Sequence, residues 1–86
     1  MEQDRRVKFG AQLKQRRMIK GFSQSEVAKA AKIPQSRLSV IEKGVGSIPS
    51  IALLWKILDA IGCDLIIVEK PERMRQPIKE TGEDNY

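Results

Sequence analysis

The sequence predicts a small, mainly α-helical domain of four to five helices, followed by a single C-terminal β-strand. Three observations predict this fold. Two short helical patterns lie close together within residues 23–44, too short to bury themselves alone. A β-branched run, Leu-Ile-Ile-Val, fills residues 65–68 and is typical of a strand. The length of 86 residues allows one domain with a thin core, which a partner subunit would help to stabilise.

The first helix is expected over residues 5–20, with Gly21 as its C-terminal stop. The second is expected over residues 24–31, because Ser-Gln-Ser-Glu, from Ser23 to Glu26, has the form of a capping box. In such a box each of the two outer side chains bonds the other residue's backbone N–H. The residues of these helices expected to face inward are Phe9, Leu13, Arg17, Val27, Ala28 and Ala31.

A turn over residues 32–34 leads to the third helix, expected over residues 35–43 and ended by Gly44. Pro34 suits the start of that helix, since proline disfavours a helical residue before it. The fourth helix is expected to open at Pro49-Ser50 and to end at Ile61-Gly62. The residues expected to face inward are Leu38, Ile41 and Glu42 in the third helix, and Ile51, Leu54, Ile57, Leu58 and Ile61 in the fourth.

The C-terminal part is expected to hold a dimerising strand at residues 63–70 and a disordered tail at residues 71–86, after a helical domain at residues 5–62. A lone apolar strand exposes an edge that invites aggregation, so we expect it to pair with the same strand of a second copy. The resulting homodimer would carry an antiparallel intersubunit ribbon. For Trp55, a second core layer beneath the strand is an equally good interpretation. The residues expected at the dimer interface are Leu53, Trp55, Leu65, Ile66, Ile67 and Val68.

The charge is concentrated in the first half of the chain. Residues 1–44 hold eleven Lys and Arg against four Asp and Glu, whereas residues 45–86 hold five against seven. A basic half beside a near-neutral remainder indicates a polyanion-binding face, with a solubilising surface as the alternative. Lys14, Arg16 and Lys20 are interpreted as solubilising charges on the first helix.

Other functions and locations are disfavoured by composition. The chain has no histidine and a single cysteine, Cys63, so a metal site, an internal disulfide and recognisable acid–base catalysis are not expected. No cofactor and no enzymatic activity are therefore predicted. The N-terminus lacks an apolar signal segment and no apolar run approaches the ~20 residues of a membrane span. We expect a cytoplasmic, nucleoid-associated protein with no membrane contact.

These elements together resemble the Cro/phage-repressor (XRE) family of helix-turn-helix proteins, over residues 9–63. In that family the helical domain is lambda-repressor-like, and the residue at the Lys32 position is usually a glycine with positive φ. A side chain there costs about 1 kcal/mol. The matching positions are Phe9-Gly10, Leu13, Arg17, Gly21-Phe22-Ser23-Gln24, Val27-Ala28, Leu38-Ser39, Ile41-Glu42, Gly44, Pro49 and Leu54.

The resemblance implies double-stranded DNA as the partner, read as a palindromic operator by the third helix in the major groove. It implies that Gln24 contacts a phosphate, and that Arg17 and Glu42 form a partly buried ion pair bracing the reading helix. Arg37 and Lys43 would contact the DNA backbone, with Arg37 also a candidate base reader. The residues implied to face base edges are Gln35, Ser36, Ser39 and Val40.

The strand after the helical domain gives a narrower resemblance, to HipB-type antitoxins. Those are dimers that repress their own operon and bind a HipA-type toxin kinase. The tail, with Ile78 and Tyr86, would then be a toxin-binding segment, a degradable end, or a tail with no specific role. Two alternatives remain: a stand-alone XRE-family regulator of phage-repressor or restriction-controller type, and a protein-binding adaptor that has lost DNA binding.

Overall fold

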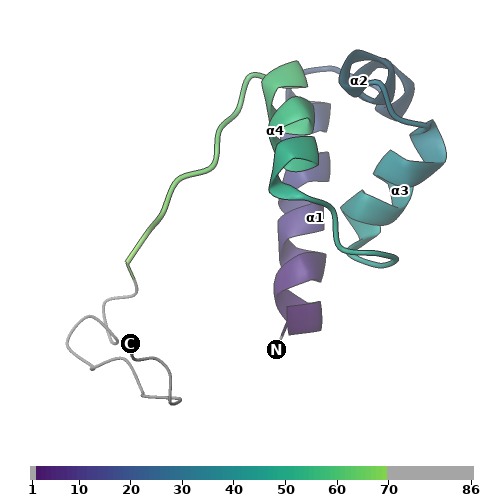
Figure 1. Ribbon diagram of the computed structural model, residues 1–86. Helices are drawn as coiled ribbons and strands as arrows, with labels where there is room; N and C mark the ends of the chain where they lie inside the picture. Colours follow the sequence, from purple (N-terminus) through teal and green to yellow (C-terminus); the bar gives the residue numbers. More distant parts are fainter. Residues whose placement is uncertain (1, 70–86) are drawn as a thin grey trace.

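The computed structural model describes residues 2–69, and this part of the chain is built from four helices. They are α1 (Glu2–Ile19), α2 (Gln24–Ala31), α3 (Gln35–Lys43) and α4 (Ile51–Ala60). Figure 1 shows α2 and α3 to the right of the long α1, at a steep angle to each other. α3 packs against α1 and α2, and α4 packs against α2.

The core is formed by small and branched aliphatic side chains from all four helices. Leu38 of α3 is fully buried and Ile57 of α4 is 1% exposed. α2 contributes Val27 and two alanines, Ala28 and Ala31, to the core. Each fully buried Leu, Ile or Val side chain stabilises such a fold by about 1.5–3 kcal/mol. The buried apolar residues are Leu13, Val27, Ala28, Ala31, Leu38, Ile41, Ile57, Leu58 and Ile61.

The helix limits agree with the sequence for α2 and α3 and differ for α1 and α4. α1 begins at Glu2 instead of residue 5, because its first turns are held by polar contacts with the loop after α3. α4 begins at Ile51, where the Ser50 hydroxyl caps the helix by accepting from the Leu53 N–H at 3.0 Å. The prediction that Ile51 faces inward is wrong. It is 52% exposed, since it lies in the first turn of α4, where the chain arrives from the loop.

Two backbone positions set the angle of α3. Lys32 ends α2 in the left-handed conformation, with φ 61°. The family resemblance predicts a positive φ at this position, where a glycine is usual. Gly10 lies where α1 crosses the end of α3, and a Cβ atom there would lie 2.6 Å from the Ile41 carbonyl oxygen. Only a residue without a side chain allows this approach of the two helices.

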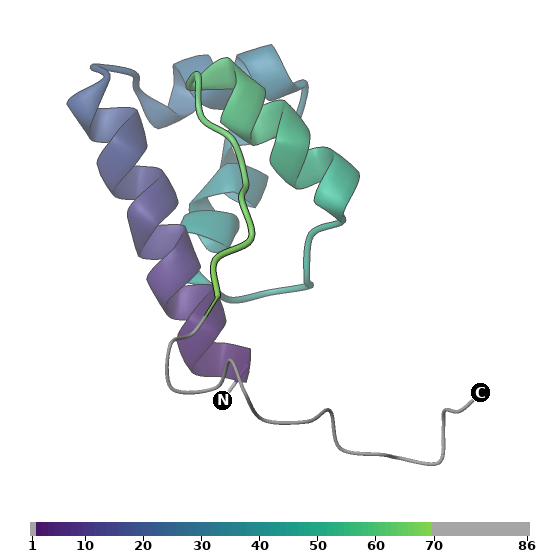
Figure 2. The same ribbon diagram turned by 90° about the vertical axis from the view of Figure 1, so that its left-hand side faces the viewer.

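The predicted strand is absent from the described residues. Residues 63–69 follow α4 as an irregular segment, drawn as a plain tube in Figure 2. A strand requires backbone hydrogen bonds with a second strand, and the described part of this chain offers none. Leu65 packs against the core, whereas Ile66, Ile67 and Val68 are 80%, 99% and 73% exposed. The intersubunit ribbon predicted from this segment is therefore not supported by the fold of the single chain.

The remaining predicted interface residues lie on α4. Leu53 packs against the core rather than standing clear of it, because it lies four residues before the buried Ile57 and therefore on the same face of α4. Trp55 is 50% exposed, so it is not a second core layer. No helix within residues 2–69 has the length and apolar character needed to cross a membrane. The predicted tail, with Ile78 and Tyr86, lies outside the described residues.

Candidate nucleic-acid interface

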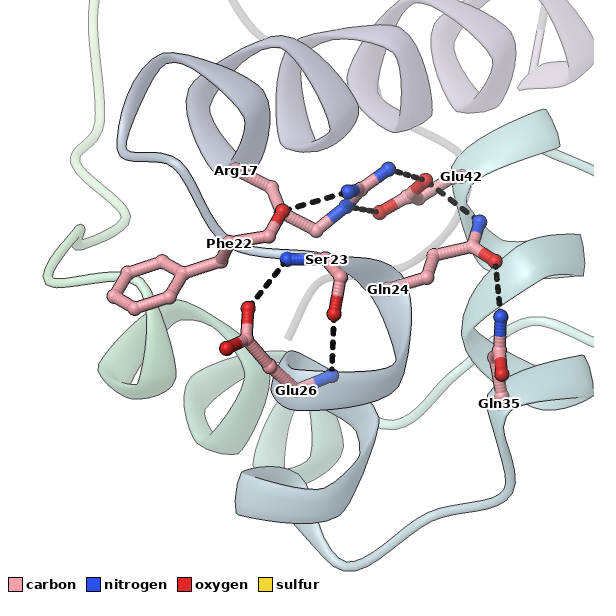
Figure 3. A network of polar contacts seen from close by, with 7 residues as sticks. All are labelled: Arg17, Phe22, Ser23, Gln24, Glu26, Gln35 and Glu42. Atoms are coloured by element: carbon pink, nitrogen blue, oxygen red, sulfur yellow. Dashed lines mark hydrogen bonds and ion pairs between the residues drawn. The ribbon is translucent and has the colours of Figure 1, made fainter.

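The capping box predicted for α2 is present and fixes the start of that helix. The Ser23 hydroxyl accepts from the Glu26 N–H at 3.0 Å, and the Ser23 N–H donates to Glu26 Oε1 at 2.8 Å (Figure 3). Gln24 is consequently the first residue of α2. Its side chain leaves the helix at the end that faces α3, where the polar residues of the site gather.

A buried ion pair joins α1 to α3 at the same place. Arg17 donates to Glu42 through two nitrogens, Nε to Oε2 at 2.7 Å and Nη2 to Oε1 at 3.0 Å. A third nitrogen, Nη1, donates to the Phe22 carbonyl oxygen at 2.9 Å, in the turn before α2. Arg17 is 8% exposed and Glu42 is 6% exposed. Because the guanidinium group is planar and forked, it can hold a carboxylate at two points and leave little freedom between the helices.

Two glutamines extend this ion pair to the surface. Gln24 Nε2 donates to Glu42 Oε1 at 3.0 Å, and Gln35 Nε2 donates to Gln24 Oε1 at 3.4 Å. Figure 3 shows the four side chains joined in the order Arg17, Glu42, Gln24 and Gln35. Gln24 is half-buried and Gln35 is exposed. The network therefore connects the interior with the first residue of α3.

The outer side of α3 is polar, and its side chains divide into two groups. Gln35, Ser36 and Lys43 are exposed, whereas Ser39 and Val40 are half-buried. Val40 lies beside the following loop, because its methyl group is 3.5 Å from where a Cβ atom on Gly46 would stand. The inner side carries Leu38, Ile41 and Glu42, all buried, as the sequence predicts. The helix thus presents a short polar face whose opposite face is fully packed.

Arg37, predicted to contact the DNA backbone and a candidate base reader, contacts the loop after α3 in the DNA-free chain, and its role on DNA stays a prediction. It is half-buried, and its Nη1 donates to the Ser47 carbonyl oxygen at 3.2 Å. This contact ties α3 to the loop between α3 and α4. Arg37 is thereby positioned along the loop.

Two residues that the sequence did not single out hold the same loop from α1. Gln3 Nε2 donates to the Gly44 carbonyl oxygen at 3.1 Å, and Arg6 Nη2 donates to the Gly46 carbonyl oxygen at 2.7 Å. Together with Arg37, they engage three backbone carbonyl groups just beyond α3. The contacts join residues 40 and 41 positions apart, so no local pattern could have indicated them.

Two basic residues at and just after the end of α1, Arg16 and Lys20, lie near the segment that follows α4. Arg16 lines a groove with Leu58, Asp64 and Val68, formed by α1, the end of α4 and the segment after it. The Lys20 Nζ lies 3.2 Å from where a Cβ atom on Gly62 would stand, also beyond α4. These contacts of Arg16 and Lys20 involve α1 and the segment after α4 and not α3, and the interpretation of Lys14, Arg16 and Lys20 as solubilising charges stays a prediction. Within residues 2–69, no three side chains of metal-binding type lie together.

A capped helix, a tight turn and a second short helix braced with its polar side outward define a protein of the helix-turn-helix class. The comparisons with known proteins agree. The helix-turn-helix family model matches residues 13–68, and the chain belongs to this family, with the XRE-type arrangement. The chain is also 44% identical over 55 residues to the uncharacterized HTH-type transcriptional regulator YqaF of Bacillus subtilis (strain 168). That match covers 64% of this chain and 71% of the relative. No solved structure matches the chain significantly.

Proposed function

We propose that the protein is a dimeric, sequence-specific transcriptional repressor that reads operator DNA with α3. The exposed polar face of α3, opposite the buried Leu38, Ile41 and Glu42, carries this proposal. An α-helix with its side chains is about 10–12 Å wide and the major groove of B-DNA is ~12 Å wide, so α3 fits the groove. Family membership and a relative named as a transcriptional regulator favour this function over an enzymatic one.

The roles of the side chains follow from their exposure. Gln35 and Ser36, exposed at the start of α3, are the principal base readers, and the amide of Gln35 can pair with adenine at two points. Ser39 and Val40 lie further along the same face. Val40 is half-buried beside the loop after α3, so only its exposed part would contact a thymine methyl group. Lys43, exposed in the last turn, supplies a phosphate contact.

Gln24 supports phosphate binding at the start of α2. The capping box uses the Glu26 N–H, which leaves the first N–H groups of the helix, those of Gln24 and Ser25, as donors for a phosphate oxygen. The Gln24 side chain is already bonded to Glu42 and Gln35, and its amide nitrogen still has a second hydrogen. In this proposal Gln24 positions Gln35 and binds the backbone at the same time.

The dimer of the proposal forms through residues 65–68. Ile66, Ile67 and Val68 are almost fully exposed, and pairing with a second copy would cover them and satisfy their backbone groups. A two-fold dimer places two reading helices on half-sites about one DNA turn, ~34 Å, apart. Such a repressor acts where the chromosome lies, in the cytoplasm.

The finer proposal is that the repressor is a HipB-type antitoxin, which represses its own operon and binds a HipA-type toxin kinase. The exposed apolar segment after α4 supports it, since that segment carries the resemblance. A stand-alone regulator and a protein-binding adaptor are the alternatives. Copurification of a kinase with the tagged protein would support the antitoxin. Operator binding by a protein with which no kinase copurifies would favour the stand-alone regulator.

The central experiment measures DNA binding. DNA fragments selected by the purified protein define the operator, and fluorescence anisotropy then compares the wild type with Gln35→Ala. We expect the substitution to weaken operator binding by about 1–3 kcal/mol without changing the fold. Gln15→Ala, an exposed glutamine on α1, is the matched control. Failure to select any sequence would reject the repressor and favour the adaptor.

A further inference from the structure

The loop between α3 and α4 is held by α1 on one side. Arg6 is half-buried, and its Nη2 donates to the Gly46 carbonyl oxygen at 2.7 Å. The two backbones are also close, since Gly44 is buried and a Cβ atom on it would lie 2.6 Å from Val7 Cα. The loop therefore rests directly on α1. Arg6 fixes the part of the loop that lies beyond this backbone contact.

The same loop contacts α3 on its other side. The Val45 N–H donates to the Val40 carbonyl oxygen at 3.1 Å. A Cβ atom on Gly46 would stand 3.5 Å from Val40 Cγ2, so the Gly46 backbone lies beside the Val40 side chain. Gly46 is thus the point where the hold from Arg6 meets a side chain of the reading helix.

The position of the loop decides which part of Val40 is open. A valine in a helix has one strongly preferred χ1 rotamer, so the Val40 side chain has little freedom of its own. It is half-buried, and the loop beside it covers part of its surface. A thymine methyl group is read through apolar contact of this kind in the major groove. A loop that is fixed keeps the same part of Val40 available to a base, and a loop that moves does not.

Two other roles for Arg6 fit the contacts less well. As a phosphate contact, its Nη2 would have to leave the carbonyl oxygen that it bonds at 2.7 Å. A contact that only stabilised the fold could lie anywhere along the loop, whereas this one is made to the glycine beside Val40. The geometry favours a role that acts through Val40.

We propose that Arg6 is a positioning residue for base recognition. It holds Gly46 beside Val40 and thereby sets the selectivity of α3 for thymine at one base pair of the half-site. The inference rests on the proposed function, in which α3 reads operator DNA. Its structural part, the hold on the loop, is measurable in the DNA-free chain.

The first test measures amide hydrogen exchange of the DNA-free full chain. Arg6→Met keeps an unbranched apolar side chain but removes every donor. We expect the Val45 N–H, which is bonded to Val40, to exchange about five-fold faster in this variant, as the loss of one hydrogen bond implies. The nuclear Overhauser contact between Gly46 and the Val40 methyl groups should weaken as well. Unchanged exchange at Val45 would overturn the proposal.

The second test measures selectivity on DNA. Once the operator is defined by selection, deoxyuridine replaces each thymine in turn, which removes only its methyl group. We expect wild-type binding to weaken about four-fold at one position, the worth of one buried methyl group. Val40→Ala identifies that position by losing the effect, and Arg6→Met should lose it too. A four-fold effect that persists in Arg6→Met, or the lack of any position that depends on Val40, would overturn the proposal.

Controls separate positioning from charge and from general loosening of α1. Lys8→Met removes a charge from an exposed neighbour on α1, and Gln3→Met removes the 3.1 Å bond to the Gly44 carbonyl group while leaving the one to Gly46. Both should keep the four-fold effect, and its loss in Gln3→Met would overturn the specific role of Arg6. The salt dependence of Arg6→Met should equal that of the wild type. A slope that is shallower by about 0.9 would make Arg6 a phosphate contact instead.

The two proposals fail in different ways. If the protein selects no operator, the proposed function fails, and hydrogen exchange still decides whether Arg6 holds the loop. If it selects an operator but Arg6→Met discriminates thymine from deoxyuridine as the wild type does, the proposed function stands and the positioning role is rejected.

Discussion

Gln24 Nε2 donates to Glu42 Oε1 at 3.0 Å, and this contact joins the first residue of α2 to a buried carboxylate of α3. The same oxygen accepts from Arg17 at 3.0 Å. Gln24 then accepts from Gln35 through Oε1. Gln35, the exposed residue proposed to read bases, is thus connected through the Gln24 side chain to the buried Arg17–Glu42 ion pair.

The first prediction concerns this connection. Gln24→Ala leaves the Arg17–Glu42 ion pair in place but removes the tether of Gln35 and the proposed phosphate contact. We expect a loss of about 0.5–1.5 kcal/mol in the free energy of unfolding, the net worth of such a hydrogen bond. Operator affinity should fall by more than this. Urea unfolding and fluorescence anisotropy measure the two quantities, and an unchanged affinity would contradict the role of Gln24.

The second prediction concerns the ion pair. Arg17→Met leaves Glu42 as a buried carboxylate without its cation, and should lower the free energy of unfolding by about 3–5 kcal/mol. The double variant Arg17→Met/Glu42→Met removes both charges and replaces them with apolar side chains. It should be more stable than Arg17→Met alone. Urea unfolding followed by circular dichroism tests this, and a double variant that is no more stable than Arg17→Met would contradict it.

Local signals were sufficient to predict α2 and α3 from the sequence. Ser23 and Glu26 mark the start of α2 through contacts three residues apart, and Gly44 marks the end of α3. The outward face of α3 follows from the spacing of Leu38, Ile41 and Glu42 on a helix of 3.6 residues per turn. These features depend on neighbours in the chain, which a sequence displays directly.

Other features depend on partners that are distant in sequence. The early start of α1 and the hold of Gln3 and Arg6 on the loop require contacts across about 40 residues, which no periodicity encodes. The β-branched run at residues 65–68 has the composition of a strand, but composition does not supply the second strand that pairing needs. The exposed Ile51 shows that an apolar stripe predicts which side of a helix faces the core, but not how far along the helix the core extends.

The third prediction concerns two positions with positive φ. Lys32 has φ 61°, and Lys32→Gly should raise the free energy of unfolding by about 1 kcal/mol, because glycine adopts this conformation without strain. Gly44 has φ 76°, and a Cβ atom there would lie 2.6 Å from Val7 Cα. Gly44→Ala should therefore destabilise the domain by more than Lys32→Gly stabilises it. Thermal unfolding of both variants tests the opposite signs, and two changes of the same sign would contradict the prediction.

The fourth prediction concerns the proposed dimer. Ile67 is 99% exposed in the single chain, so Ile67→Asp should leave the fold intact while placing a charge in the apolar ribbon. We expect monomers by light scattering at concentrations where the wild type is a dimer. Ile19→Asp changes another exposed isoleucine, 65% exposed on α1, and is the matched control. A dimer that persists in Ile67→Asp would place the interface elsewhere, for example on the exposed Trp55.

The fifth prediction separates contacts with phosphates from contacts with bases. A cation that neutralises a phosphate releases a counterion from DNA, so log K falls as log salt concentration rises. Each such contact makes this slope steeper by about 0.9. Lys43 is exposed in the last turn of α3, and Lys43→Gln should reduce that slope by about 1 on every sequence tested. Gln35→Ala should instead lower affinity for the operator alone and leave the slope unchanged. Lys14→Gln, an exposed lysine on α1, is the control for net charge. If Lys14→Gln reduced the slope as much as Lys43→Gln, the attraction would be a property of the whole basic half and α3 would lose its assignment as the helix that enters the groove.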